Sequence, residues 1–295
     1  MANMREIKTR IRSITDTRQI TKAMKLISAA KLKKARQQLE QTAPFFDKVK
    51  STMADILAHS GNIDNSFFDV RNQKEGHKKA FLVISGDGGL SGGYNSNINK
   101  LAEKEIIKSP DSMVFVAGHM GRSYFIRKGL NVNQDFDFSV QNPTVYRARE
   151  IADILIELFK KGDIDEVYVV YTQMVSTIKL VPRIMKLLPL ELPALKKELK
   201  VPESVPDDID EALSYEPSPG AVFNVLVPKY VKGIVYGALV EAFTSEQSAK
   251  MTAMDSATSN ADEMLQKLNL FYNRARQASI TQEISEIVGG AAALK

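Results

Sequence analysis

The chain has 295 residues, no cysteine and a formal net charge of +5, so disulfides, thiolate metal ligands and thiol redox switches are excluded. No run of eighteen apolar residues occurs, and we expect no transmembrane segment. The charge is uneven: residues 1–50 hold thirteen Lys/Arg and four Asp/Glu, a net of +9, and the remainder sums to −4. A basic first segment indicates an acidic protein surface, a nucleic acid or an anionic membrane, although a solvated helix face is commoner.

Residues 4–58 predict one long helix, because apolar side chains recur at helical spacing. Two short stripes come first, and a strict alternation of three and four residues follows. The stripes are Ile7, Ile11 and Ile14, then Ile20, Met24 and Ile27, and the alternation is Leu32, Ala35, Leu39, Thr42, Phe46, Val49, Met53 and Ile56. Pro44 removes a backbone hydrogen bond and should bend this helix locally.

The middle of the chain alternates short apolar runs with helical segments. The expected strands are 80–84, 113–117, 136–140, 167–172 and 177–186, and the expected helices are 94–108, 120–128 and 144–161. This alternation predicts a Rossmann-like α/β domain with a mainly parallel sheet covered by helices. Continuous apolar runs are typical of parallel strands buried on both faces. Residues 189–220 contain six prolines and are expected to form a linker.

Residues 228–288 predict a second long helix, roughly 90 Å in length, with Pro228 in its first turn. Small or apolar residues recur at steps of four and three, and a second seam follows a register shift. The first seam is Val231, Val235, Ala238, Ala242, Ser245, Ala249, Thr252, Ser256 and Ser259, and the second is Ala261, Leu265, Leu268, Tyr272, Ala275 and Ser279. Two seamed helices predict a long antiparallel coiled coil of the N- and C-terminal segments, with two separate helices in a bundle as the alternative.

The loop Ser85–Asn95 is rich in glycine and lies between a strand and a helix, where phosphates often bind. It lacks the Gly-Lys-Ser/Thr of a triphosphate site, and Ser91 stands where the dinucleotide fingerprint needs its third glycine. Residues 89–93 match the hydrolase pattern G-x-S-x-G, but Ser91 lies seven residues beyond Ile84 instead of directly after the strand. We expect a turn with positive φ, no catalytic residue and no cofactor site.

Metal and nucleic-acid sites are not expected either. His59, His77 and His119 are scattered, without carboxylates at ligand spacing. Aromatic residues do not interleave with the basic residues before Phe45, which disfavours stacking on single-stranded nucleic acid.

Several short motifs, in order along the whole chain, carry a family resemblance. They are Ile20–Met24, Gly88–Leu90 with Gly92–Asn95, Leu187–Leu190, Tyr215–Pro217, Ser245–Gln247 and, the most specific, Ala275–Glu283. Together they resemble the γ subunit of F-type ATP synthases, of the bacterial type. Gly88 stands where that family often has arginine. The absence of cysteine argues against the redox regulation of plastid members.

The resemblance implies a central-stalk rotor that couples ion-driven rotation of a membrane c ring to ATP synthesis or hydrolysis at α/β catalytic sites. Its implied partners are the α and β subunits, the ε subunit and the c ring. The implied location is peripheral, on the cytoplasmic face of the bacterial plasma membrane, with no signal or transit peptide. The expected division is a shaft helix (1–58), a linker (59–79), the Rossmann-like domain (80–188), a proline-rich linker or foot (189–220) and a second shaft helix (221–295).

The same resemblance assigns contacts to individual residues. Near the start of the chain, Lys22, Met24 and Lys25 would face an acidic loop of β. Near its end, Arg276, Gln277 and Thr281 would contact β loops, and Tyr215 would lie near the c ring.

Two other functions stay open on the residues alone. A nucleotide-dependent enzyme built on the middle sheet would need a phosphate-binding motif, which is absent. A coiled-coil adaptor for nucleic acid or membrane would use the basic first helix.

Overall fold

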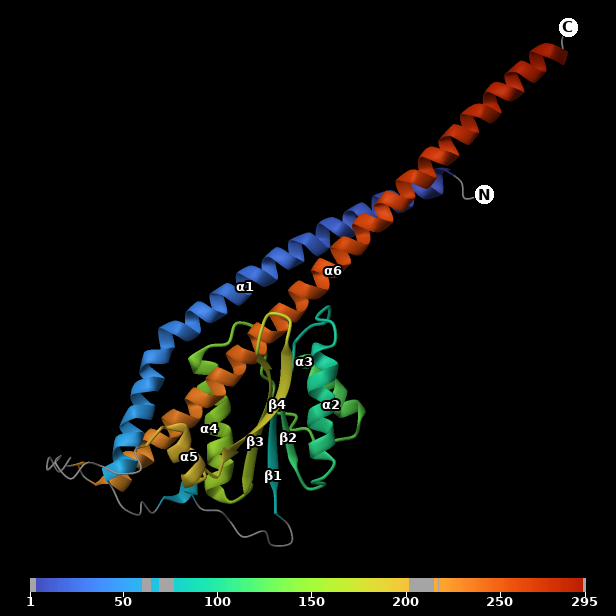
Figure 1. Ribbon diagram of the computed structural model, residues 1–295. Helices are drawn as coiled ribbons and strands as arrows, with labels where there is room; N and C mark the ends of the chain where they lie inside the picture. The colour runs from blue at the N-terminus through green and yellow to red at the C-terminus, as the bar shows by residue number, and fades with distance from the viewer. Residues whose placement is uncertain (1–3, 60–64, 69–76, 202–214, 217, 294–295) are drawn as a thin grey trace. The chain divides into compact units, whose positions relative to one another are not determined.

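A computed structural model of the protein describes residues 4–59, 65–68, 77–201, 215–216 and 218–293 (Figure 1). The chain forms two compact units. One consists of the residues up to 29 together with those from 250 onward, and the other of residues 30–249. The first and last helices each contribute to both units.

The first helix, α1, spans Met4–His59 and confirms the prediction for residues 4–58. Pro44 lies inside it, and the part of α1 that follows bends away from the preceding turns (Figure 1). A proline without a backbone N–H produces such a bend.

The last helix, α6, spans Pro219–Ala293, so it begins nine residues earlier than predicted. The Ser218 hydroxyl accepts a hydrogen bond from the Ala221 N–H at 3.2 Å and caps the helix, with Pro219 in the first position, where no N–H is needed. Pro228 therefore lies inside α6 and does not start it.

Four strands form one mixed sheet: β1 (Lys79–Ile84), β2 (Met113–Ala117), β3 (Glu166–Met174) and β4 (Leu180–Leu188). Their order is β2-β1-β3-β4. β1 pairs in parallel with both neighbours, and β4 pairs antiparallel with β3. The expected, mainly parallel α/β domain is confirmed, because only the last strand at one edge runs the other way.

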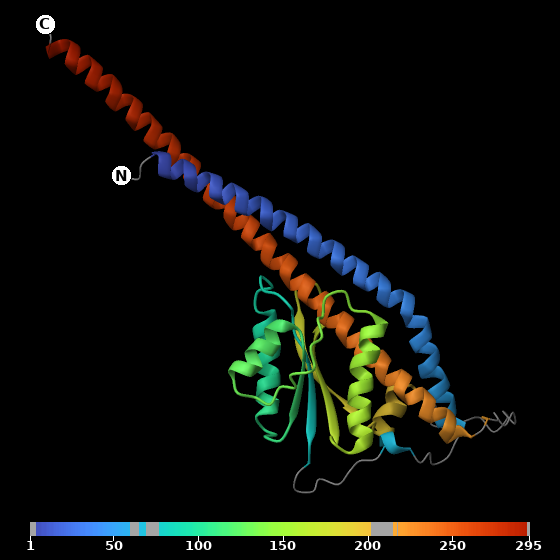
Figure 2. The same cartoon turned by 180° about the vertical axis from the view of Figure 1, so that it is seen from behind.

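Helices cover both faces of this sheet (Figures 1 and 2). α2 (Tyr94–Ile106) and α3 (His119–Arg127) pack on one face, and α4 (Val145–Lys161) and α6 pack on the other. Both ends of α4 are capped as its sequence predicts. The Thr144 hydroxyl accepts from the Arg147 N–H, and Gly162 closes the helix with φ +83°.

Residues 136–140 are not the strand that we expected. They make one isolated bridge, between Phe138 and Ala117, although Phe136 and Val140 are buried. Two of their backbone donors bind side chains instead: the Val140 N–H donates to Asp87 Oδ2 at 3.0 Å, and the Phe136 N–H donates to Asn133 Oδ1 at 3.0 Å. A segment whose N–H groups bind side chains cannot form a ladder.

Two short helices lie in the segments expected to be linkers: a 3₁₀ turn at Ser66–Phe68 and the helix α5 at Leu192–Glu198. Pro193 occupies the first turn of α5, where proline is tolerated, so counting prolines did not reveal this helix. The expected seam in residues 32–56 is confirmed in part, since Ala35, Val49, Met53 and Ile56 are buried.

α1 and α6 pair antiparallel in each unit. In the first unit Arg18 contacts Asp262, Thr21 contacts Thr258 and Lys25 contacts Asp255. In the second unit the ring of Phe46 packs against Gly233 and Tyr236, so closely that a Cβ on Gly233 would lie 2.5 Å from Phe46 Cδ1. The antiparallel pairing predicted from the seams is therefore confirmed. Among the described residues, no helix has a stretch apolar and long enough to span a membrane.

Candidate functional site

The predicted contact residues near the start of the chain lie in a polar section of the coiled coil. Arg18 Nη1 lies 3.0 Å from Asp262 Oδ1, and Lys25 Nζ lies 2.5 Å from Asp255 Oδ1. Between these two ion pairs the hydroxyls of Thr21 and Thr258 share a hydrogen bond of 2.8 Å. The ion pairs are half-exposed, so water screens them and each contributes little stability.

This section corrects the expected seam of α1. The seam begins with the predicted residues Ile7, Ile11 and Ile14. Beyond Ile14 it continues in steps of four and three through Arg18, Thr21, Lys25 and Ser28. Ile20 and Ile27, which we placed in a second seam, are 60% and 55% exposed. Six residues from Ile14 to Ile20 advance a helix by roughly 600°, which leaves Ile20 about 120° from the seam. An uninterrupted helix keeps the same face toward its partner, and from Arg18 to Ser28 the residues on that face are polar.

The seam of α6 shifts earlier than predicted. Met254, Ala261 and Leu265 are buried, whereas the expected seam residues Thr252, Ser256 and Ser259 are exposed. The second seam therefore extends back to Met254, since an apolar Met at the contact stabilises the pair more than a small polar residue does.

Large apolar residues of α1 are exposed on both sides of its seam. Ile20 and Ile27 lie on one side, and Leu26 lies on the other side together with Lys22, which is also exposed. Met24 is half-buried. Neighbouring exposed apolar residues such as Ile20 and Ile27 are typical of a protein interface.

A shallow groove of about 310 Å³ lies on the side of α1 that carries Lys22 and Leu26. Lys22, Lys25 and Leu26 line it from α1. Asp255, Thr258 and Asp262 line it from α6. The structure thus brings Lys22 and Lys25 together, with the carboxylate of Asp255 already paired to Lys25.

The second predicted cluster lies on the last turns of α6, which continue beyond the end of α1 (Figure 1). Arg276, Gln277 and Thr281 are exposed. The Thr281 hydroxyl donates to the backbone carbonyl of Gln277 at 2.9 Å. Four large apolar residues of the same segment are also exposed: Ile280, Ile284, Ile287 and Val288. The sequence analysis did not assign these residues, although their spacing of three and four marks one helix face.

Tyr215 belongs to the other unit. It is half-buried against the main core of that unit. Burial and the nearby negative charge of Asp55 raise the pKa of its hydroxyl, so it is a neutral hydrogen-bonding group.

The glycine-rich loop is a rigid structural turn. Leu90 and Gly92 have φ values of +64° and +56°, which confirms the expected positive φ, and Ser91 is buried. The carboxylate of Asp87, which the sequence analysis did not single out, accepts four hydrogen bonds. Their donors are the N–H groups of His119, Val140 and Gln141 and the Ser139 hydroxyl, at 2.6–3.2 Å. Asp87 thereby joins the loop after β1 to the start of α3 and to the segment before α4.

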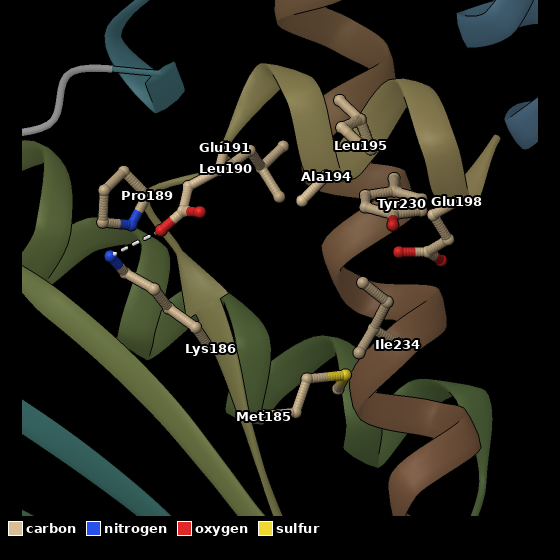
Figure 3. Close-up of a pocket in the computed structure, with 10 residues that line it drawn as sticks. All are labelled: Met185, Lys186, Pro189, Leu190, Glu191, Ala194, Leu195, Glu198, Tyr230 and Ile234. Carbon is tan, nitrogen blue, oxygen red and sulfur yellow. Dashed lines mark hydrogen bonds and ion pairs between the residues drawn. The ribbon is translucent and has the colours of Figure 1, made fainter. Parts of the chain in front are cut away.

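A pocket of about 240 Å³ opens between β4, α5 and α6 (Figure 3). Its apolar lining includes Leu195 and Ile234. At one end Lys186 Nζ lies 3.2 Å from Glu191 Oε1. At the other end burial and the Glu198 carboxylate raise the pKa of Tyr230. Ligand pockets usually enclose about 300–1,000 Å³, so this pocket is small for a nucleotide.

Comparison with known proteins gives a consistent result. A family profile described as ATP synthase matches residues 3–294. The ATP synthase gamma chain of Ruminiclostridium cellulolyticum is 64% identical and that of Acetivibrio thermocellus is 57% identical, and both alignments cover at least 99% of each chain. The fold is similar to a chain in a cryo-EM structure of the Euglena gracilis mitochondrial ATP synthase (OSCP/F1/c-ring), with a TM-score of 0.64, 17% identity and coverage of 99% of this chain and 94% of that one.

Proposed function

The chain belongs to the ATP synthase gamma chain family, and we propose that it couples ion-driven rotation of the membrane c ring to ATP synthesis or hydrolysis at the α/β catalytic sites. It is a rotor subunit of the central stalk. The observation that carries the proposal is the antiparallel pair of α1 and α6, in which α6 extends past α1 with exposed apolar residues (Figure 1).

Two helices side by side present different side chains in different directions. Within a ring of alternating α and β subunits, such a pair touches each catalytic subunit with a different surface at any moment. Rotation then moves each site through different affinities, which is a coupling free energy carried by one element. The chain carries out no bond chemistry itself in this scheme.

The proposed contacts follow the exposed surfaces. Lys22, Met24 and Lys25 would meet an acidic loop of β, since cations complement an acidic surface. Further along α6, three exposed polar residues would donate and accept hydrogen bonds with other β loops. They are Arg276, Gln277 and Thr281.

The rest of the chain would serve the base of the stalk. Residues 80–188 would be the Rossmann-like domain that binds the ε subunit, and residues 189–220, with Tyr215, would be the foot at the c ring, although 202–214 and 217 lie outside the described residues. The proposed shaft segments are 1–58 and 221–295, whose described parts belong to α1 and α6, and residues 59–79 would join the first to the domain. The protein would lie at the cytoplasmic face of the bacterial plasma membrane as a peripheral component.

The test of the proposal is reconstitution with purified α and β subunits. We expect the three chains to co-purify as one complex that hydrolyses ATP, and the chain alone to have no ATPase activity. Failure to associate, or turnover by the isolated chain after contaminating ATPases are removed, would contradict the proposal.

The contact at Met24 has its own test. Met24→Lys adds a cation next to the proposed acidic loop, and a new charged hydrogen bond there contributes about 1.5–3 kcal/mol to one rotor angle. We expect assembled complexes that bind nucleotide normally and pump fewer ions per ATP hydrolysed. Gln37→Lys adds the same charge at an exposed position of α1 in the other compact unit, and it should leave pumping unchanged. Normal pumping by Met24→Lys would remove Met24 from the interface.

A further inference from the structure

One helical turn and a half of α6 is polar although it is deeply buried. Thr244, Ser245, Glu246, Gln247 and Ser248 are each at most 4% exposed, and Glu246 is 0% exposed. Burying a carboxylate in a protein interior is unfavourable unless it interacts with compensating groups. This buried segment therefore needs polar partners, which apolar packing alone does not supply.

The segment lies across the carboxyl ends of the strands. The Ser245 hydroxyl donates to the Thr172 carbonyl at 2.9 Å, and the Met174 N–H donates to Glu241 Oε1 at 3.0 Å, so this part of α6 is bonded to the end of β3. The Tyr94 hydroxyl, just after the loop that follows β1, donates to the Ala242 carbonyl at 2.9 Å.

This position is the ligand position of the fold class. In doubly wound sheets, ligands bind outside the carboxyl ends of the strands, where the strand order reverses. With the order β2-β1-β3-β4, that reversal lies between β1 and β3. Anions are the usual occupants, held near the loop after the first strand.

Glu246 lies where that loop begins. A Cβ on Gly86 would lie 3.1 Å from Glu246 Cδ and 3.3 Å from its Oε1, so the carboxylate rests directly on the backbone of Gly86. The Gly86 N–H donates to Asn95 Oδ1 at 2.8 Å, which holds the loop in place. Tyr94 lies close by: burial, followed by the negative charge of Glu246, raises the pKa of its hydroxyl.

We propose that the Glu246 carboxylate is a built-in anionic ligand of this position, and that its seat on the Gly86 loop fixes the rotation of α6 on the sheet. Apolar contacts are non-directional and do not by themselves set the rotation of a helix, so Glu246 acts together with the hydrogen bonds that Ser245, Glu241 and the Ala242 carbonyl make. Polar contacts are directional, and a buried polar residue in an apolar seam sets register in the same way. Glu246 is thus a positioning residue for torque transmission. This inference rests on the proposed rotor function.

The test uses three variants in the assembled complex with its membrane sector: Glu246→Ala, Glu246→Gln and the control Glu263→Ala. Glu263 is an exposed glutamate of the same helix. The measurement is the number of ions pumped per ATP hydrolysed. For Glu246→Ala and Glu246→Gln we expect this ratio to fall by about twofold or more, with hydrolysis retained, and for Glu263→Ala we expect no change.

Small-molecule rescue separates charge from space. Sodium formate supplies a carboxylate to the space left in Glu246→Ala, whereas formamide has a similar size and no charge. We expect formate to raise the unfolding temperature of the Glu246→Ala chain and to restore part of its pumping ratio, and formamide to do neither. The wild-type chain should not respond to formate.

Each outcome decides the inference. An unchanged pumping ratio in Glu246→Gln, which keeps the side-chain volume, would overturn it even if Glu246→Ala fails to fold. Equal rescue by formamide would reduce Glu246 to a space-filling residue. If the wild-type chain itself fails to assemble with α and β, the rotor function fails first, and that result is distinct from the behaviour of the variants.

Discussion

The two compact units use the same pair of helices in different ways. In the unit of residues 30–249, α6 lies against a sheet and an apolar core that includes Val231, Val235 and Phe243, and its polar side chains there are buried and bonded to strand ends. In the other unit the seam is partly polar and half-exposed, and large apolar residues such as Ile20 and Ile27 face outward. Buried contacts fix a helix firmly, whereas screened ones fix it weakly. One helix is therefore held by its own chain along residues 219–249, whereas large apolar residues of α6 beyond residue 250 are exposed.

The largest expected effect concerns two phenylalanines of α6. Phe243 is 2% exposed and Phe271 is 54% exposed. Phe243→Ala should lower the free energy of unfolding by about 3–5 kcal/mol, because it removes buried area and leaves a cavity. Phe271→Ala should change it by less than about 0.5 kcal/mol. Urea unfolding followed by circular dichroism measures both, and similar losses would break the contrast between the two units.

A smaller effect separates two glycines one turn apart. Gly233→Ala places a Cβ against the Phe46 ring and should destabilise the chain by about 1–3 kcal/mol. Gly237 has open space around its Cβ position, so Gly237→Ala should stabilise the helix by about 0.5–1 kcal/mol. We expect the urea midpoint to fall in Gly233→Ala and to rise in Gly237→Ala. A stabilising shift in Gly233→Ala as well would show that Phe46 moves aside.

The stability of residues 30–249 should fall in acid through Glu166. Burial by itself raises the pKa of this carboxyl, but hydrogen bonds from Lys186 and Tyr168 and the charges of Lys186 and Lys79 outweigh it and hold the pKa below its ordinary 4.5. A lowered folded pKa contributes stability that is present above the unfolded value and is lost as pH falls through the folded value. In Glu166→Gln that contribution is missing at all pH values.

The measurement for Glu166 is the difference in urea midpoint between the wild-type chain and Glu166→Gln. We expect it to be largest near about pH 7 and to shrink below about pH 4. Glu263→Gln, at an exposed site, is the control. A difference that does not depend on pH would show that the network holds Glu166 by shape alone.

The smallest effect belongs to the polar seam. Asp255→Asn removes the half-exposed ion pair with Lys25 and should cost at most about 1 kcal/mol. Because exposed pairs are screened, the loss should fall further as salt is raised to about 1 M. A double-mutant cycle with Lys25→Met measures the pair itself. A coupling above about 2 kcal/mol would mean that this seam is as tightly held as the buried part of α6.

Much of the fold could be predicted from local signals. The apolar runs at 80–84 and 113–117 form β1 and β2. Thr144 caps the start of α4 and Gly162 ends it. The outer limits of α1 also followed from periodicity. Each of these features is set by residues close together in the chain, so the sequence is enough to determine them.

Tertiary structure decided the rest. Periodicity predicted a second apolar stripe at Ile20, Met24 and Ile27, and this was wrong. The face that contacts α6 there carries Arg18, Thr21 and Lys25, because a continuous helix presents one face to its partner. Residues 136–140 lost their strand to the carboxylate of Asp87, about fifty residues away in the sequence. The family motif at Ser245–Gln247 gave no sign that Glu246 lies on the Gly86 loop. In all three cases the local structure depends on which residue, distant in the sequence, packs against it, and a local pattern contains no information about that contact.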